Sequence, residues 1–361
     1  MPRVSFTVGK SYRAGVPVCS CTVGSHHHTL RVSKAARARH EIADRNLAAT
    51  EAAVQRMFEV VQGQLKLSQI ATLLQQGDLT GLDRYLDLEN RLQAVVQGAG
   101  LQPEEDSFWE ILARIRRQAA EAELVRLRNV PIAKTGVGVA MILDMESPES
   151  IAFLETYRMD LVREVSRKTR QAIQTVLLEA FRYGGHPYDQ ARTLRGMIGL
   201  TDTQVRAVEN FRRALQGDPK AIRQALDRSL RDKRFDPTLW RAVRTGTGLT
   251  PARVNTMVER YYQRYLKYRS EMIARTETIR AGVQGTQETW RQAADQGYLD
   301  RDKTRQMWIV GFRGCETCVA TRRMNAEGVP LGEMFATEYG PVTGPPLHPH
   351  CGCDVVLEFV N

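Results

Sequence analysis

Sulfur and imidazole groups gather close to the C-terminus of this chain. Cys315 and Cys318 are separated by two residues, and a loop rich in glycine and proline then leads to the run His348-Pro349-His350-Cys351-Gly352-Cys353. Cysteine sulfurs and histidine nitrogens are the ligands that zinc prefers in structural sites, and a Cys-x-x-Cys pair can hold one cation with both sulfurs. The spacing therefore predicts a structural zinc site that holds the C-terminal region in shape.

Zinc takes four ligands in a tetrahedron, and this region offers more candidates than that. The set that we favour is Cys315, Cys318, His348 and Cys351. If the tail after Cys351 is a strand, Cys351 and Cys353 lie on one face, so Cys353 could replace His348. Four protein ligands leave no open position for a catalytic water, which favours a structural role over catalysis. The alternative is that the cysteines stay reduced without a metal.

The composition sets outer limits on the class of protein. A length of 361 residues predicts two or three domains with a substantial core. Lys and Arg number 51 against 41 Asp and Glu, and the formal charge of +10 fits either an acidic partner or a solvated basic surface. Neither an apolar run of about 18 residues nor a secretory signal is recognisable. We therefore expect a soluble protein in a reducing compartment, where clustered cysteines favour metal over disulfides.

Residues 1–40 form a segment without any Asp or Glu. We expect a flexible, extended basic arm, because such a segment cannot bury enough apolar surface to order itself. Its cations could contact nucleic-acid phosphates or an acidic partner, and they are Arg3, Lys10, Arg13, Arg31, Lys34, Arg37 and Arg39. The arm also contains Cys19, Cys21 and three histidines at 26–28. A second metal site is conceivable there, although soft residues in a flexible tail are the simpler interpretation.

Apolar residues recur at helical spacing over most of the remaining chain. We expect a helical region over 41–144, a helical middle domain over 145–269 and a small C-terminal module over 270–361. The expected fold class is therefore mainly α, with helical N-terminal and middle regions and a small α+β module stapled by zinc.

Three helix starts are explicit in the sequence. Ser147-Pro148 and Thr250-Pro251 each place a hydroxyl before a proline that suits the first helical turn, and Thr201 with Gln204 forms a capping box. The helix that starts at Thr250-Pro251 carries a tyrosine-rich stretch, 261–268, with interleaved Arg and Lys. Such a stretch could stack on nucleic-acid bases, but it is more often core on one face and solvated charge on the other.

Further motif residues precede the cysteines. Between Ala274 and the C-terminus, the chain presents in order Arg275, Thr276, Glu277, Trp290, Gly297, Trp308, the Cys-x-x-Cys pair, Phe335 and the Pro345–Cys353 run. Over residues 270 to 357, the order and spacing of these motifs resemble the phage head morphogenesis family typified by the F protein of phage Mu. The chain departs from that pattern by a Gly311–Gly314 segment where an acidic residue is usual, and by Gly352 where arginine is common.

The resemblance implies a minor capsid protein of a tailed phage or prophage, which acts in head assembly and is not an enzyme. It implies a location in the capsid interior near the portal vertex, after assembly in the host cytoplasm. The implied partners are the portal protein, other head proteins and packaged double-stranded DNA. A membrane is not among the implied partners. Arg275 and Glu277 project about 200° apart on a helix, so they cannot easily act on one substrate atom. We therefore expect them to make structural bonds between the helix and the C-terminal module.

Two other classes stay open. One is a metal-dependent nuclease of the His-Asn-His type, in which His348 or His350 would activate water beside a second cation. The other is a DNA-binding protein without catalysis, whose salt-sensitive affinity would depend on residues 1–40.

Overall fold

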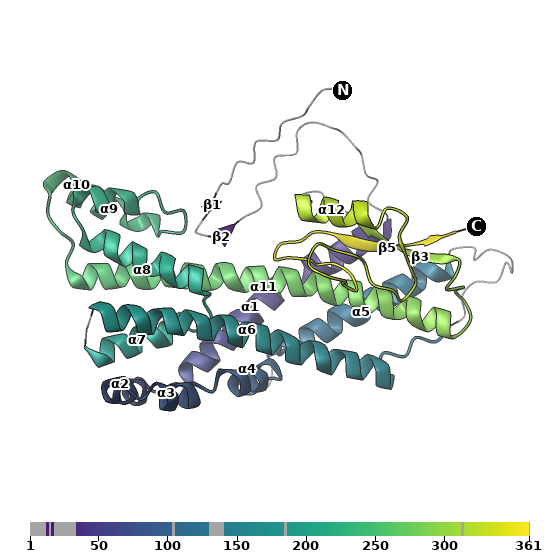
Figure 1. Cartoon of the computed structure of the whole chain (residues 1–361), viewed down its shortest axis with the longest axis horizontal. Coiled ribbons are helices and arrows are strands. Elements are labelled where there is room, and N and C mark those ends of the chain that lie inside the picture. The colour runs from purple at the N-terminus through teal and green to yellow at the C-terminus, as the bar shows by residue number, and fades with distance from the viewer. Residues whose placement is uncertain are drawn as a thin grey trace, which may run out of the picture. The chain divides into compact units, whose positions relative to one another are not determined.

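A computed structural model describes residues 34–102, 105–129, 141–183, 186–311 and 314–360. It also gives two short N-terminal strands, β1 (Tyr12–Arg13) and β2 (Val16–Pro17), which pair antiparallel. The described chain is mainly α-helical, with a small antiparallel sheet near the C-terminus (Figure 1). The predicted fold class is therefore confirmed. Among the described residues, no helix is long and apolar enough to cross a membrane.

Helices account for most of the chain between Lys34 and Asp295. The helices are α1 (Lys34–Gly63), α2 (Leu67–Gln76), α3 (Leu79–Leu86), α4 (Leu88–Val96), α5 (Phe108–Arg128), α6 (Pro148–Tyr183), α7 (Pro187–Met197), α8 (Asp202–Gln216), α9 (Pro219–Ala225), the 3-10 helix η1 (Lys233–Phe235), α10 (Asp236–Thr245), α11 (Pro251–Asp295) and α12 (Glu316–Met324). The three predicted starts are confirmed, since α6 and α11 begin at the expected prolines and Thr201 makes the expected capping box.

Contacts between residues divide the chain into two compact units. Among the described residues from Lys34 onward, the first unit comprises 55–100 and 159–270, and the second comprises 34–54, 101–158 and 271–360. Each unit thus draws on separate stretches of sequence, whereas the sequence suggested consecutive regions.

Aromatic side chains form much of the core of the first unit. The Phe211 ring lies 4.3 Å from that of Tyr261, which in turn lies edge-on to Tyr265 at 5.0 Å. Tyr261, Tyr262 and Tyr265 are all buried, which confirms the core interpretation of this stretch. Burial also raises the pKa of Tyr262 and Tyr265. These rings are therefore not available to stack on nucleic-acid bases.

The second unit brings α11 very close to α5. A Cβ atom on Gly285 would lie 2.1 Å from the carbonyl oxygen of Arg116, so only glycine fits at this position. One turn later, the Thr289 hydroxyl donates to the carbonyl of Ala120 at 3.1 Å. The glycine thus permits an approach between helix backbones that the threonine then uses for a hydrogen bond.

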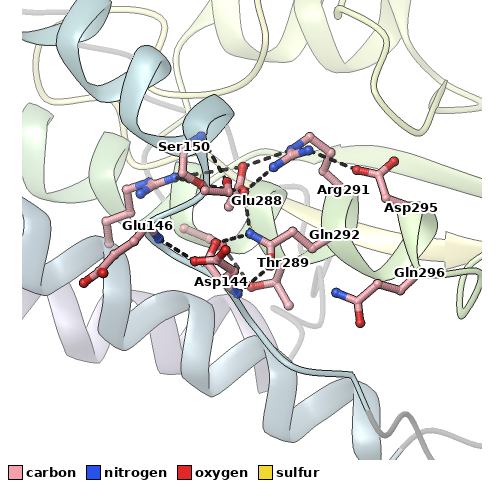
Figure 2. A network of polar contacts seen from close by, with 12 residues as sticks. Asp144, Glu146, Ser150, Glu288, Thr289, Arg291, Gln292, Asp295 and Gln296 are labelled. Atoms are coloured by element: carbon pink, nitrogen blue, oxygen red, sulfur yellow. Dashed lines mark hydrogen bonds and ion pairs between the residues drawn. The ribbon is translucent and has the colours of Figure 1, made fainter.

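A polar network continues along α11 and ties it to the start of α6 (Figure 2). The carboxylate of Glu288 accepts from the hydroxyl of Ser150 at 2.7 Å and from Arg291 at 2.6 Å. Gln292 donates to the same carboxylate at 2.7 Å and accepts from the amide of Asp144 at 2.8 Å. These bonds lower the pKa of Glu288 against the opposing effect of burial, which is the largest single influence.

The small sheet of the second unit has the strand order β4-β3-β5, with all pairs antiparallel. Its strands are β3 (Thr304–Ile309), β4 (Val329–Pro330) and β5 (Asp354–Phe359). Trp308 on β3 pairs with Val355 on β5, and both are fully buried. The last strand, β5, directly follows Cys353 in sequence, and the sheet shares a hydrophobic cluster with the cysteines.

A buried arginine of α1 anchors the beginning of β5. Arg39 is 6% exposed, and its Nε donates to the carboxylate of Asp354 at 2.9 Å. Its guanidinium also donates to the carbonyl of Val355 and lies 3.7 Å from the carboxylate of Glu123. Glu123 in turn accepts from the indole nitrogen of Trp290 at 2.6 Å. Arg39 is thus an internal counterion for two buried acids.

This arrangement corrects part of the predicted basic arm. The arm was expected to extend to residue 40, but α1 begins at Lys34 and includes Arg37 and Arg39. The assignment of Arg39 to nucleic-acid contact was wrong, because its charge is buried and paired. Arg13 lies in β1, whereas Arg3, Lys10 and Arg31, like the N-terminal Cys and His residues, lie outside the described residues.

Replacing Arg39 with alanine should leave the buried carboxylate of Asp354 without its closest counterion, whereas Glu123 keeps its ion pair with Arg126. We expect the free energy of unfolding at pH 7 to fall by about 3 to 5 kcal/mol, measured by urea denaturation. Arg45→Ala is the matched control, because Arg45 is an exposed residue of the same helix whose side chain donates to the carbonyl of Glu41. The control should change stability by about 0.5 kcal/mol at most.

The deficit of Arg39→Ala should depend on pH. Burial raises the pKa of Asp354, and Arg39 opposes that shift. An acid whose folded-state pKa is raised makes stability fall as pH increases from about 4 through that pKa. Without Arg39 the pKa should rise further, so the deficit should be largest at neutral pH and shrink toward about pH 4. A deficit that did not vary with pH would contradict the pairing of these charges.

Candidate metal centre

The first two cysteines lie at the N-terminal end of α12. Cys315 is the N-cap residue and Cys318 lies in the first turn, and their sulfurs are 3.6 Å apart. The positive end of the helix dipole stabilises thiolates at these positions. Both side chains are buried and lie at the same end of the helix, so both sulfurs could contact one cation.

His348 completes one triad with these sulfurs. Its Nε2 atom lies 3.1 Å from the sulfur of Cys315 and 3.1 Å from that of Cys318. Its Nδ1 donates to the carbonyl of Pro349 at 2.8 Å. Because a carbonyl can only accept, the proton belongs on Nδ1 and the lone pair of Nε2 points at the sulfurs. This is the tautomer that a metal ligand needs.

Cys351 and Cys353 form a second triad with Cys318. The amide of Cys351 donates to the carbonyl of His348 at 3.0 Å, and His350 adopts a positive φ of 60° in this turn. The turn places the sulfur of Cys351 3.7 Å from that of Cys318. The sulfurs of Cys318, Cys351 and Cys353 lie within 4.8 Å of one another. The two triads therefore share Cys318.

The spacing of these atoms suits a tetrahedral ion. With zinc–sulfur bonds of about 2.3 Å, two sulfurs of a tetrahedron lie about 3.8 Å apart, close to the 3.6 and 3.7 Å seen here. A disulfide would need about 2.05 Å. The cluster of Cys315, Cys318, His348, Cys351 and Cys353 could therefore hold a metal ion. It offers five ligands for four positions, with His348 and Cys353 in different triads, so both stay open as the fourth ligand.

The thiols compete for negative charge in this buried cluster. Hydrogen bonds from Cys318 and Cys353 lower the pKa of Cys351 to about 2, and the amides of Leu347 and Cys353 add to the effect. The bond to Cys351 raises the pKa of Cys318. At Cys353, a bond from Cys318 lowers the pKa, but Cys351 and burial outweigh it and raise the value to about 12. One thiolate is thus stable without a cation, and further ionisation requires a compensating positive charge.

A glycine pair brings the loop before α12 against the last cysteines. A Cβ atom on Gly311 would lie 2.0 Å from the carbonyl oxygen of Gly352, whereas a Cβ atom on Gly352 would meet nothing within 4 Å. The amide of Gly311 donates a hydrogen bond to the sulfur of Cys353. Gly311 therefore has a steric and a polar role in the cluster, while Gly352 has room for a side chain.

The motif residues have different surroundings. Trp290 and Trp308 belong to the same hydrophobic cluster as the four cysteines, and Trp308 lies edge-on to Phe335 at 5.4 Å. Glu277 bonds Tyr157 of α6 and Arg280 of its own helix. Thr276 bonds the carbonyl of Met272, and Arg275 is exposed.

Among the described residues, Glu277 bonds the helices and not the C-terminal module. Arg275 lies close enough to that module for its charge to act on His350, whose pKa is lowered first by burial and then by Arg275. Gln287, about three turns beyond Glu277 on α11, bonds the C-terminal module directly. Its side-chain amide donates to Gln306 of β3 at 2.9 Å and to the carbonyl of Thr343 at 2.6 Å. Sequence reasoning missed Gln287, gave Arg39 a different role and noted Gly311 only as a departure from the family pattern. Of the three, only Gly311 offered a signal, through its lack of a side chain.

Loss of Cys318 should cost more metal than loss of either spare ligand. We expect Cys318→Ser to purify with little zinc, because it breaks both triads, while His348→Ala and Cys353→Ser each keep most of it. The double variant His348→Ala/Cys353→Ser should match Cys318→Ser, since only three ligands remain. Elemental analysis of the purified chains measures this. Thr317→Ala, between the first two cysteines, is the control, and equal losses in all ligand variants would contradict the shared role of Cys318.

Gly311→Ala should disturb the cluster where Gly352→Ala does not. The added methyl group at Gly311 must displace the backbone of Gly352, which we expect to lower stability by about 1 to 3 kcal/mol and to weaken metal binding. Competition with a chromogenic zinc chelator measures the affinity. Gly352→Ala is the matched control on the other side of the same contact, and an equal effect of the two substitutions would disprove the one-sided packing.

The chain matches no protein-family model, no curated protein and no solved structure. The similarity to phage head proteins noted from the motifs therefore stays a resemblance of short motifs at the C-terminal end. Function has to be inferred from the residues of the metal centre and from the elements that hold them.

Proposed function

We propose that this chain is a structural protein without catalytic activity, whose C-terminal module is held in shape by a zinc ion. The observation that carries the proposal is the convergence of four cysteines and one histidine from two distant segments. Sulfur and imidazole ligands at tetrahedral spacing favour zinc over harder cations such as magnesium or calcium. When bound, zinc supplies a dication that lets several buried thiols ionise together.

The protein groups offer enough ligands to fill the coordination shell of zinc. Two triads that share Cys318 present five candidate ligands for four positions, so protein side chains alone could occupy them all and leave no place for a catalytic water. The cysteines are also buried within the hydrophobic cluster that contains Trp290, Trp308 and Phe335. These features support a role in stability, and they weigh against a nuclease in which His348 activates water.

We further propose that the chain is a minor head protein of a tailed phage or prophage, located inside the capsid near the portal vertex. The support is the motif resemblance over residues 270 to 357, together with the packing of its distant members. Trp290, Trp308, Phe335 and the four cysteines belong to one cluster. A motif set that forms one core can persist as a unit, because each member stabilises the others.

Head assembly tests this proposal directly. The chain should be produced together with the portal and capsid proteins encoded beside it, and we expect it to sediment with assembled heads. Cys315→Ser and Cys351→Ser should lower its incorporation severalfold while far-ultraviolet circular dichroism retains most of the helical signal. Thr317→Ala should be incorporated normally.

Two results would overturn the proposal. One is sedimentation of the wild-type chain apart from heads that assemble normally. The other is cleavage of plasmid DNA by the purified chain with magnesium or manganese, abolished by His348→Ala, which would establish a nuclease instead.

A further inference from the structure

Cationic side chains are concentrated on α9 and α10 of the first unit. Lys220 and Arg223 lie on α9, and Arg241 and Arg244 lie on α10, which packs against α9. All four side chains are exposed, and none makes an ion pair with a carboxylate among the described residues. We call these four cations and the exposed Trp240 between them the α9–α10 face.

Two neighbouring arginines of the same unit differ from the cations of the α9–α10 face, because acids compensate their charge. Arg231 pairs with Asp236 at 2.9 Å, and Arg234 pairs with the buried Asp232 at 2.6 Å, which lowers the pKa of Asp232 to about 2. The nearest acid on α9 is its N-cap residue Asp218, whose carboxylate accepts from the amide of Ala221. The four cations of the α9–α10 face differ from these two arginines, because no carboxylate among the described residues pairs with them.

Helix geometry places these groups on one surface. Successive residues of a helix are about 100° apart, so Trp240, Arg244 and Arg241 span an arc of that width. Leu239 and Ala242, on the other side of α10, are buried. The guanidinium of Arg223 lies over the indole of Trp240, 5.2 Å from its centre, which joins the two helices at the middle of the face. The indole itself stays 43% exposed.

We propose that the α9–α10 face binds the phosphate backbone of a nucleic acid. Four uncompensated cations around one aromatic ring fit a polyanion, because each phosphate contact releases condensed counterions and an exposed indole can lie against a sugar or base. The charge complementarity selects this partner. The proposal does not rest on the metal centre or on a role in phage heads, since every residue of the face lies in the first unit.

The test measures binding of the full-length chain to a short fluorescent DNA duplex and to one of its strands, by anisotropy across a salt series. The face variant is Lys220→Gln/Arg241→Gln/Arg244→Gln. The control variant Arg84→Gln/Arg192→Gln/Arg260→Gln removes three exposed cations elsewhere in the same unit, so both variants have the same net charge. Both should melt at the wild-type temperature, because all six side chains are exposed.

We expect the face variant to lose at least tenfold in affinity near physiological salt and to lower the salt dependence by roughly one unit of log–log slope per lost phosphate contact. The control variant should lose much less. Trp240→Ala distinguishes the two ligands, and Tyr188→Ala, which removes an exposed ring that also lies beneath an arginine, is its control. A loss restricted to the single strand places a base on the indole, and an unchanged single-strand affinity assigns the face to duplex phosphates.

Two outcomes would overturn the proposal. Equal losses in the face and control variants would show that net charge alone causes binding. Binding to phosphatidylglycerol vesicles that DNA does not compete away would show that the face recognises anionic lipid and not a polynucleotide.

Discussion

The C-terminal half of this protein depends on one constraint, which is that buried negative charge must be compensated. Four cysteines enclosed by tryptophan, phenylalanine and valine side chains can carry one thiolate between them, stabilised by S–H and N–H donors at Cys351. A second thiolate needs a cation. The loops that carry the ligands have few apolar groups of their own, so a shared ion is the interaction that can fix them to α12 and to the sheet.

The same constraint is met by a different cation only one residue further along the chain. Asp354 directly follows Cys353, and its carboxylate is neutralised by Arg39 from the opposite end of the sequence. Glu123 shares this guanidinium and also accepts from the indole of Trp290. The start of β5 is therefore held on one side by the sulfur cluster and on the other by a protein side chain. The C-terminal module is thereby tied into the helices of its unit by buried electrostatics.

Local signals in the sequence predicted local structure well. The capping box at Thr201, the prolines that begin α6 and α11, and the cysteine spacing all depend on neighbouring residues, and the structure has each of them. The tyrosine stripe was correctly interpreted as core. Arg39 was misassigned because the residues before it include no acid, and nothing nearby indicates a buried acid 315 residues away. Gly311 and Gln287 were missed for the same reason, since their partners are defined by tertiary packing.

Arg39 has one more consequence, which concerns the open side of the sheet. Among the described strands, β5 is an edge, and edges invite pairing with foreign chains. At Val355 both backbone groups are already occupied, because the amide donates to the carboxylate of Asp354 and the carbonyl accepts from Arg39. An incoming strand would have to break a buried ion pair before it could add there. A charge placed for internal balance thus also blocks strand addition at this position of β5.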